Sequence, residues 1–198
     1  PPPPAPPPDK SIYMNETVKA FEGIAKEGEI RYAKDENDIT PQIDELLDRA
    51  AGKTLDLVVC LDTTDSMGDD IAAVKKTLPA LLKKRVADFS SFRVGFVLYK
   101  DYFEEYLYKK FDFVTDLGRF QTNLNSVRVG GGRDIPEAVY EALYAAIKEF
   151  RWTADARMVI LIGDAPPHPL PRANVDKAKV DAAALELGVE LDVIILPH

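Results

Sequence analysis

Cysteine and histidine are scarce in this chain of 198 residues, which contains one cysteine and two histidines. Cys60 lies in the apolar run of residues 57–61, where it is interpreted as a small buried side chain, and it cannot form an intrachain disulfide. Zinc sites use clustered Cys and His ligands, and the three residues are widely separated. The composition therefore gives no support for a zinc cluster.

The sequence also lacks a long apolar run and an excess of basic residues. No run approaches the ~18 apolar residues of a membrane span, so no direct membrane insertion is expected from this segment. Lys and Arg number 25 against 33 Asp and Glu, a formal net charge of −8. Nucleic acid and anionic membrane surfaces attract clustered positive charge, so neither is an expected partner. Such an acidic chain is better suited to cations.

Proline is concentrated at the N-terminus, where residues 1–8 comprise seven prolines and one alanine. This composition favours an extended polyproline II rod and cannot build a core, so residues 1–10 are predicted to be a tether. A docking motif for a proline-binding domain is the alternative. A tether of this kind favours an extracytoplasmic protein, periplasmic or at the surface, with a lipid anchor. A cytoplasmic location is the alternative.

Residues 11–54 are predicted to form a helical extension that packs on the main domain. One helix is expected over residues 16–26 and another over 41–51, the second beginning with Thr40 as N-cap and Pro41 in the first helical position. Apolar residues recur at helical spacing in the second helix, which predicts a buried face. They are Ile43, Leu46, Leu47 and Ala50.

Residues 55–198 alternate short apolar runs with longer helical patterns, which is typical of a mostly parallel sheet covered by helices. Strands are expected over 55–61, 92–99, 106–113, 158–162 and 189–196, and helices over 67–82, 116–125, 138–150 and 175–187. The third strand follows the second too closely for a crossover helix, so it is expected to be an antiparallel edge strand. The predicted fold is α/β, an open sheet with helices on both faces and a binding crevice at the carboxyl ends of its central strands.

Three polar motifs fall at that crevice. Asp62-Thr63-Thr64-Asp65-Ser66 follows the first strand, Gly130-Gly131-Gly132 leads to Pro136-Glu137 before a helix, and Gly163-Asp164-Ala165-Pro166-Pro167-His168 follows a buried strand. Hard oxygen ligands such as those of Asp62, Thr64 and Ser66 suit Mg²⁺ better than Zn²⁺. The alternative is that these side chains only cap the following helix. The glycines are expected to let the backbone approach the first motif closely.

Together the motifs resemble the metal-ion-dependent adhesion site of von Willebrand factor type A (vWA) domains, in the subgroup with Gly-Gly-x-Asp-x-Pro-Glu and Gly-Asp-Ala-Pro-Pro-His loops. The resemblance covers residues 55–197 and implies a Rossmann-like vWA fold. It implies that Asp62, Thr64 and Ser66 are ligands from the first loop and Asp164 from the third. In the second loop, where better-known members have threonine, this sequence has Asp134, with Arg133 in the place of the third glycine. Asp134 is either a ligand or only a helix cap that forms a capping box with Glu137.

The resemblance also implies a function. A bound Mg²⁺, with Mn²⁺ or Ca²⁺ as alternatives, would hold a protein partner that offers a carboxylate, and the chain would not be an enzyme. One alternative is a scaffold whose metal site is vestigial. Another is a metal-dependent hydrolase or phosphotransferase with Asp62 as nucleophile, but Thr64 stands where that chemistry needs a second carboxylate, and no lysine is obviously placed to neutralise a phosphate.

The family fold usually closes with another helix, and often a further strand, after the equivalent of Leu196. Either those elements lie beyond residue 198, or residues 11–54 cover that face of the sheet.

Overall fold

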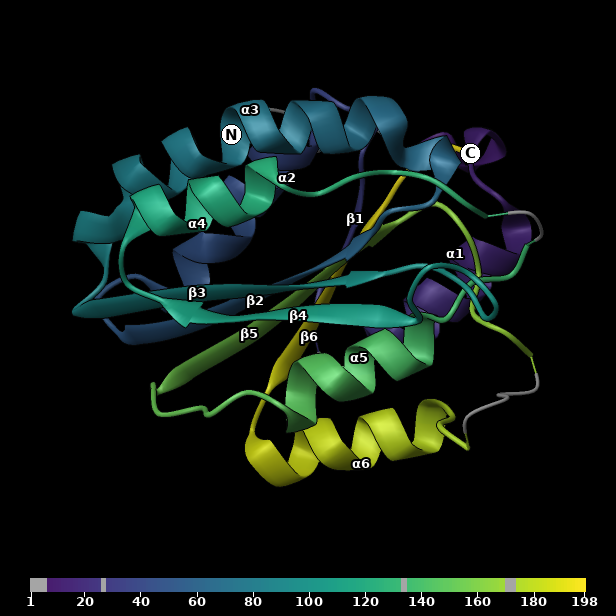
Figure 1. Ribbon diagram of the computed structural model, residues 1–198. Coiled ribbons are helices and arrows are strands. Elements are labelled where there is room, and N and C mark those ends of the chain that lie inside the picture. Colours follow the sequence, from purple (N-terminus) through teal and green to yellow (C-terminus); the bar gives the residue numbers. More distant parts are fainter. Residues whose placement is uncertain (1–6, 26–27, 133–134, 170–173) are drawn as a thin grey trace.

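A six-stranded sheet forms the centre of the molecule in the computed structural model, which describes residues 7–25, 28–132, 135–169 and 174–198 (Figure 1). The strands are β1 (Ile30–Tyr32), β2 (Thr54–Asp62), β3 (Ser91–Tyr99), β4 (Tyr108–Val114), β5 (Ala156–Gly163) and β6 (Glu190–Ile195). Their order across the sheet is β1-β6-β5-β2-β3-β4. All neighbours are parallel except β3 and β4, which are antiparallel. The predicted α/β fold with an antiparallel edge strand is confirmed.

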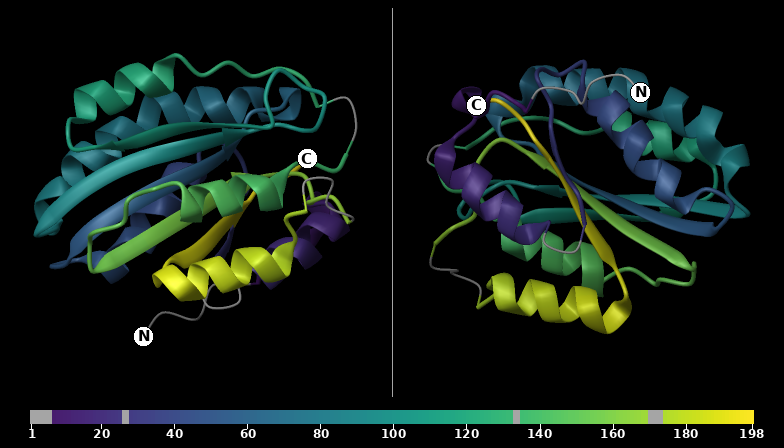
Figure 2. Two further views of the ribbon diagram at one scale, coloured as in Figure 1. Left: turned by 60° about the horizontal axis from the view of Figure 1, so that its bottom comes forward. Right: turned by 180° about the vertical axis from the view of Figure 1, so that it is seen from behind.

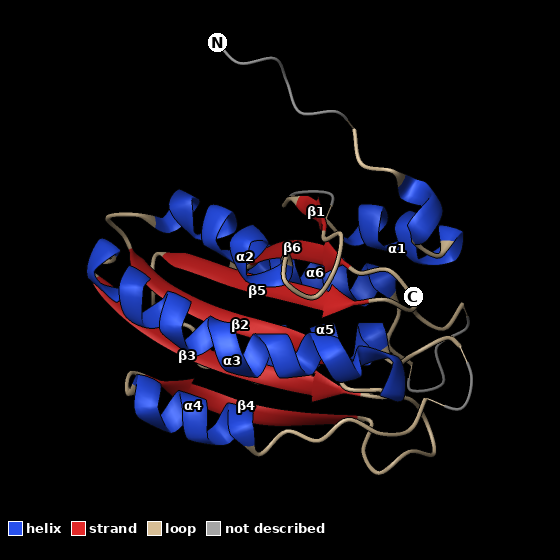
Figure 3. Ribbon diagram, turned by 90° about the horizontal axis from the view of Figure 1, so that it is seen from above, coloured by secondary structure: helices blue, strands red, loops and turns tan. Residues whose placement is uncertain are grey.

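Helices cover both faces of this sheet (Figure 3). One face carries α2 (Ile39–Leu47), α3 (Gly68–Arg85) and α4 (Leu117–Asn125), and the other carries α1 (Asn15–Ile24), α5 (Val139–Lys148) and α6 (Lys177–Leu187). The part of the chain that the structure describes also contains four short 3₁₀ helices: η1 (Lys10–Ile12), η2 (Asp48–Ala50), η3 (Asp65–Met67) and η4 (Val86–Asp88). Within the described ranges, no helix combines the length and the apolar character needed to cross a bilayer.

The central strand β2 shows why its sequence is a continuous apolar run. Leu57, Val59 and Leu61 are fully buried in the core beneath α2, α3 and α4. Val58 and Cys60, which point to the opposite face, are fully buried in the core beneath α1, α5 and α6. A strand covered on both sides favours apolar side chains on both of its faces, as over residues 57–61, and Cys60 is one of them.

The N-terminal segment contains a strand that the sequence pattern did not predict. β1 pairs in parallel with β6, with Ile30 opposite Val193 and Tyr32 opposite Ile195. Three residues are too few to show a periodicity, so the pairing partner alone defines this strand. The place beside β6 at this edge of the sheet is thus occupied by residues of the segment 11–54.

The start predicted for the second helix is wrong by two residues. α2 begins at Ile39 with Asp38 as N-cap residue, so Thr40 is not the cap and Pro41 is the third helical residue. Ile39 is fully buried, which accounts for the earlier start. Proline is tolerated there because the first N–H groups of a helix have no partner within the helix.

The topology places a crevice at the ends of β2 and β5. From β2 the chain continues to β3 on one side, whereas β5 and β6 lie on its other side. The strand order therefore changes direction at β2, and in open α/β sheets ligands bind outside the carboxyl ends of the strands at such a point. Asp62 is the last residue of β2, and Asp164 directly follows β5.

Candidate metal centre

The first loop folds back on the carboxylate of Asp62, which has no exposed surface. Oδ1 of Asp62 accepts hydrogen bonds from the main-chain N–H of Thr64 at 2.9 Å and from its hydroxyl at 2.7 Å. The hydroxyl of Thr64 lies 3.4 Å from that of Ser66. The three side chains that the sequence placed in one site are therefore adjacent.

These side chains do not cap the helices that follow. The N-cap residues of η3 and α3 are Thr64 and Met67, and neither helix has a side-chain cap hydrogen bond. Asp62 instead closes a tight turn by accepting from a residue two positions later. Its other oxygen, Oδ2, is buried and has no hydrogen-bond partner among the described residues.

Asp164 directly follows the neighbouring strand β5 and lies close to Asp62, because Leu61 of β2 is opposite Ile162 of β5. Its side chain is buried, with Oδ2 2.9 Å from Nδ1 of His198. Oδ1 is buried without a hydrogen-bond partner in the part of the chain that the structure describes. A Cβ added at Gly163 would lie 2.5 Å from the hydroxyl oxygen of Tyr99 and 3.7 Å from Oδ2 of Asp62. Glycine at this position thus permits the close approach of the strand ends.

Burial and the charge of Asp164 make the ionisation of Asp62 costly. Burial, and then the charge of Asp164, raise the pKa of Asp62 to about 7, against the opposing effect of the Thr64 hydrogen bonds and the charge of Lys100. Burial and the charge of Asp164 also raise the pKa of Asp70 to about 6. Negative charge at this edge is therefore incompletely neutralised by the protein, and a bound cation would favour the ionised forms.

The residues present fit a hard divalent cation. Oδ2 of Asp62 and Oδ1 of Asp164 are buried and lack hydrogen bonds within the described structure. The hydroxyl oxygens of Thr64 and Ser66 are the neighbouring atoms that could also bind a metal. Among the described residues, no group of three or more His, Cys, Asp and Glu side chains is arranged to hold a metal ion. An oxygen set with few charges leaves positions for water, which Mg²⁺ usually retains.

The second loop lies against the first through its backbone. The N–H of Gly130 donates to the carbonyl of Thr63, and the N–H of Asp65 donates to the carbonyl of Gly131, each at 3.1 Å. A Cβ at Gly132 would lie 2.8 Å from Cβ of Thr64, so the expected role of the glycines in close approach is confirmed.

Asp134, the ligand predicted from this second loop, and its neighbour Arg133 lie outside the described residues. The capping-box interpretation is nevertheless wrong, because α5 begins at Val139 with Ala138 as N-cap residue. The N–H of Glu137 is instead bound to the carbonyl of Pro166 in the third loop, at 2.9 Å. This link between loops keeps Glu137 outside the helix.

Lys100 is a site residue that the sequence did not reveal. It is 3% exposed at the end of β3, and its ammonium donates to the main-chain carbonyls of Thr63 and Gly130. No lysine was expected to be placed to neutralise a phosphate, and Lys100 does not overturn that expectation, because its ammonium is already bound by main-chain carbonyls. Because both loop carbonyls hold the ammonium, Lys100 joins the first and second loops. In the sequence, the local indication of this role is that Lys100 directly follows a predicted buried strand.

Asp101 and His168 form a second buried link, 2.5 Å apart between Oδ1 and Nε2. The pair joins the loop after β3 to the third loop, and the ring of Tyr102 packs edge-on against the imidazole at 5.1 Å. In the sequence, Asp101 follows a predicted strand and His168 ends the third motif. Their contact depends on residues 67 positions apart.

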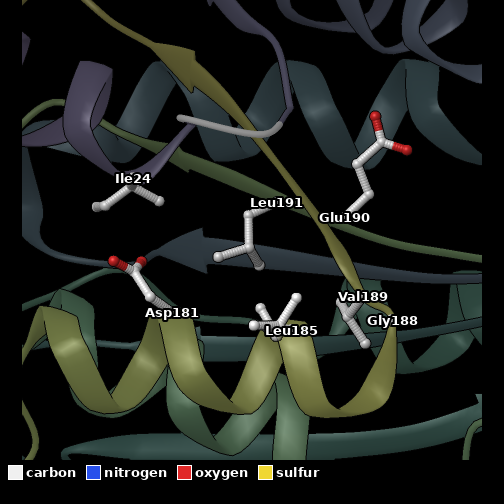
Figure 4. A pocket seen from close by; sticks show the side chains of 8 residues that line it. Ile24, Asp181, Leu185, Gly188, Val189, Glu190 and Leu191 are labelled. Carbon is white, nitrogen blue, oxygen red and sulfur yellow. The ribbon is translucent and has the colours of Figure 1, made fainter.

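The residues that carry the two hydroxyls, Thr64 and Ser66, line a cleft of about 330 Å³. Its lining includes Thr64 and Ser66 from the first loop, Ile135 from the second, and Ala165 with His198 on the third side. A larger hollow of about 680 Å³ lies at the opposite end of β6, where apolar side chains of α1, α6 and β6 face one another (Figure 4). The described residues that line that hollow include the carboxylates of Asp181 and Glu190 but no hydroxyls like those of Thr64 and Ser66, so the smaller cleft is the candidate site.

Comparisons with known proteins show the family and the fold of this chain. Residues 56–186 match a sequence model of the von Willebrand factor A domain. The chain is 30% identical over 156 residues to the α-protein kinase vwkA of Dictyostelium discoideum, covering 77% of this chain and 24% of that protein. It is similar in fold to proximal thread matrix protein 1 of the mussel byssus, with a TM-score of 0.53 and 16% identity over 74% of this chain and 36% of that one. The chain thus spans a minor part of both relatives, and it belongs to the von Willebrand factor A domain family.

Proposed function

We propose that this chain is a metal-dependent binding module. A divalent cation, Mg²⁺ in the first place, would be held by Asp62, Thr64, Ser66 and Asp164, with Asp134 as a further ligand from the second loop. The cation would accept a carboxylate of a protein partner. The loops around the cleft would supply the remaining contacts.

The observation that carries this proposal is the pair of unsatisfied carboxylate oxygens. Oδ2 of Asp62 and Oδ1 of Asp164 are buried without a hydrogen-bond partner in the described structure. A buried carboxylate oxygen without a partner costs free energy, and this cost is offset when a cation binds between the groups. The hydroxyls of Thr64 and Ser66 line the adjoining cleft.

The catalytic alternative has less support. Phosphoryl transfer to Asp62 would need an acid or base two residues later, and that residue is Thr64. Lys100 lies close by, but its ammonium is engaged by the carbonyls of Thr63 and Gly130. We therefore propose that the chain has no enzymatic activity of its own. Absence of turnover of a phosphatase substrate with Mg²⁺ is the expected result, and turnover that is lost in Asp62→Ala would overturn this part.

Titration calorimetry with Mg²⁺, Mn²⁺ and Ca²⁺ tests the metal site directly. Bound metal is expected to stabilise the folded protein by ~2.7 kcal/mol when its free concentration is a hundredfold above Kd. Asp62→Ala and Ser66→Ala are expected to abolish this metal-dependent gain. Asp112→Ala is the matched control, because it also removes a carboxylate but lies on the exposed edge strand, where its side chain is 74% exposed.

The vestigial-site alternative makes the opposite prediction. If millimolar concentrations of all three cations gave no heat of binding and no rise in unfolding temperature, the chain would be better described as a scaffold. A peptide that carries a single Asp or Glu is the probe for the partner step. Its binding should require the metal and should be lost when the acidic residue is replaced by its amide.

A further inference from the structure

Helix α1 reaches the metal centre although it lies outside the residues that match the family. The match spans residues 56–186, whereas α1 comprises Asn15–Ile24. In the first turn of α1, Thr17 is fully buried, and its hydroxyl donates to the main-chain carbonyl of Asp164 at 3.1 Å. These two residues are 147 positions apart in the sequence. The contact joins the N-terminal segment to the residue predicted to provide the third-loop ligand.

The helix that carries Thr17 is held firmly against the sheet. Phe21 and Ile24 follow Thr17 at helical spacing, and both are buried in the core that also contains residues of β6. The ribbon of α1 lies beside β6 (Figure 2). The strand that follows α1 is hydrogen-bonded to β6, with the N–H of Val193 donating to Glu29 at 2.9 Å and that of Ala33 donating to Ile195 at 3.0 Å. Thr17 therefore sits on a fixed element rather than on a loose extension.

The surroundings of Asp164 show what this hydrogen bond can do. The preceding residue, Gly163, is held by the N–H of Leu196 at 3.1 Å. The side chain of Asp164 is held on one oxygen by His198. Thr17 holds its carbonyl, and the remaining oxygen, Oδ1, is buried with no hydrogen-bond partner among the described residues. The three contacts together restrict how the carboxylate can turn.

We propose that Thr17 is a positioning residue of the metal centre. It fixes the main chain of Asp164 so that Oδ1 remains available to the cation, and it thereby makes the N-terminal segment part of the site. This inference rests on the proposed function, because it needs a metal that Asp164 helps to hold. Groups that orient a metal ligand without touching the metal commonly change its affinity for that metal by about 10- to 100-fold.

Replacing the hydroxyl of Thr17 tests this role. Thr17→Val keeps the shape of the side chain and removes the donor, and Thr17→Ala removes the donor without adding a methyl group. Both are expected to weaken Mg²⁺ binding by about tenfold in titration calorimetry, the lower end of the range for groups that orient a metal ligand without touching the metal. Thr17→Ser keeps the hydroxyl and is expected to bind Mg²⁺ within about twofold of the unmodified chain.

Tyr13→Phe is the control for a loss of stability alone. The hydroxyl of Tyr13 makes a buried hydrogen bond of 2.9 Å to the carbonyl of Ala33, in the same N-terminal segment but not in a metal loop. This variant should lower the unfolding temperature without changing the Kd for Mg²⁺. If Thr17→Val or Thr17→Ala also lowered only the unfolding temperature, with Kd unchanged, the positioning role would be refuted. Failure of the unmodified chain to bind Mg²⁺ would instead refute the proposed function, and with it this inference.

Discussion

Two glycines share a left-handed backbone conformation but differ in what surrounds them. Gly132 has φ of +80° and Gly52 has φ of +78°, both in the left-handed region that favours glycine. A Cβ at Gly132 would lie 2.8 Å from Cβ and 3.1 Å from Cγ2 of Thr64, whereas one at Gly52 would meet nothing within 4 Å. Substituting each of these two glycines therefore separates the free-energy cost of backbone strain from the cost of displacing the first metal loop.

Alanine at these two positions should give different results. Gly52→Ala is expected to destabilise the fold by about 1 kcal/mol through backbone strain alone. Gly132→Ala is expected to cost about 1 kcal/mol more and to weaken Mg²⁺ binding, because Thr64 must move away from Asp62. Denaturant unfolding measures the first effect and calorimetric titration the second. Equal stability and equal Mg²⁺ affinity of the two variants would contradict the role assigned to Gly132.

At the scale of elements, one ion pair joins β2, β3 and the segment before β5 at the end of the sheet opposite the metal centre. Asp56 is opposite Arg93 in the register of β2 and β3, and the guanidinium binds both carboxylate oxygens at 2.8 and 2.7 Å. The N–H groups of Thr153 and Ala154 donate to the same carboxylate. Burial alone would raise the pKa of Asp56, but these hydrogen bonds and the charge of Arg93 outweigh it, so its pKa is lowered.

Asp56→Asn is expected to reduce the free energy of unfolding by about 2 kcal/mol at pH 7, because charged hydrogen bonds are lost in a buried place. A carboxyl whose pKa is lowered by folding stabilises the protein above its unfolded pKa of about 3.9 and ceases to do so as the pH falls through its folded pKa. The difference between the two proteins should therefore shrink below about pH 4.

Asp112→Asn is the control for the ion pair of Asp56. Asp112 pairs with Lys110 on the edge strand at 2.8 Å, with its side chain 74% exposed. Such pairs contribute little, so a change below about 0.5 kcal/mol is expected in the same denaturant experiment. A similar loss in both variants would show that burial of Asp56 is not the source of its effect.

At the scale of the whole molecule, the N-terminal segment completes both the sheet and the core. β1 pairs with β6, while α1 lies on one face of the sheet and α2 on the other. The apolar residues of α2 are fully buried against the core. They are Ile39, Ile43, Leu46 and Leu47. The main domain would expose this surface if the segment were removed.

Two truncations test the contribution of this segment. Removing residues 1–10 should change the free energy of unfolding by less than about 0.5 kcal/mol, because residues 7–10 are exposed and the pair between Lys10 and Glu22 lies on the surface. Removing residues 1–52 should cost more than about 5 kcal/mol, since several buried side chains are lost together. Thermal unfolding compares the two, and equal unfolding temperatures would show that the main domain does not need the segment.

The order and type of most elements were determined by the sequence itself, because they follow from local patterns. The apolar run of β2 predicts a buried strand without any knowledge of the neighbouring strands. The short connection between β3 and β4 requires antiparallel pairing. Asp62 and Asp164 could be placed together for the same reason. Both follow parallel strands, whose carboxyl ends meet at one edge of a sheet.

Only the tertiary structure decided the features that depend on partners distant in the chain. β1 is a strand because β6 lies beside it, and three residues carry no pattern of their own. The links of Lys100 to Gly130, of Asp101 to His168 and of Thr17 to Asp164 join residues 30, 67 and 147 positions apart. A polar side chain shows in its sequence context that it can bond, but not to which group. Burial removes water as the alternative partner, and the packing of the elements then selects the protein group that replaces it.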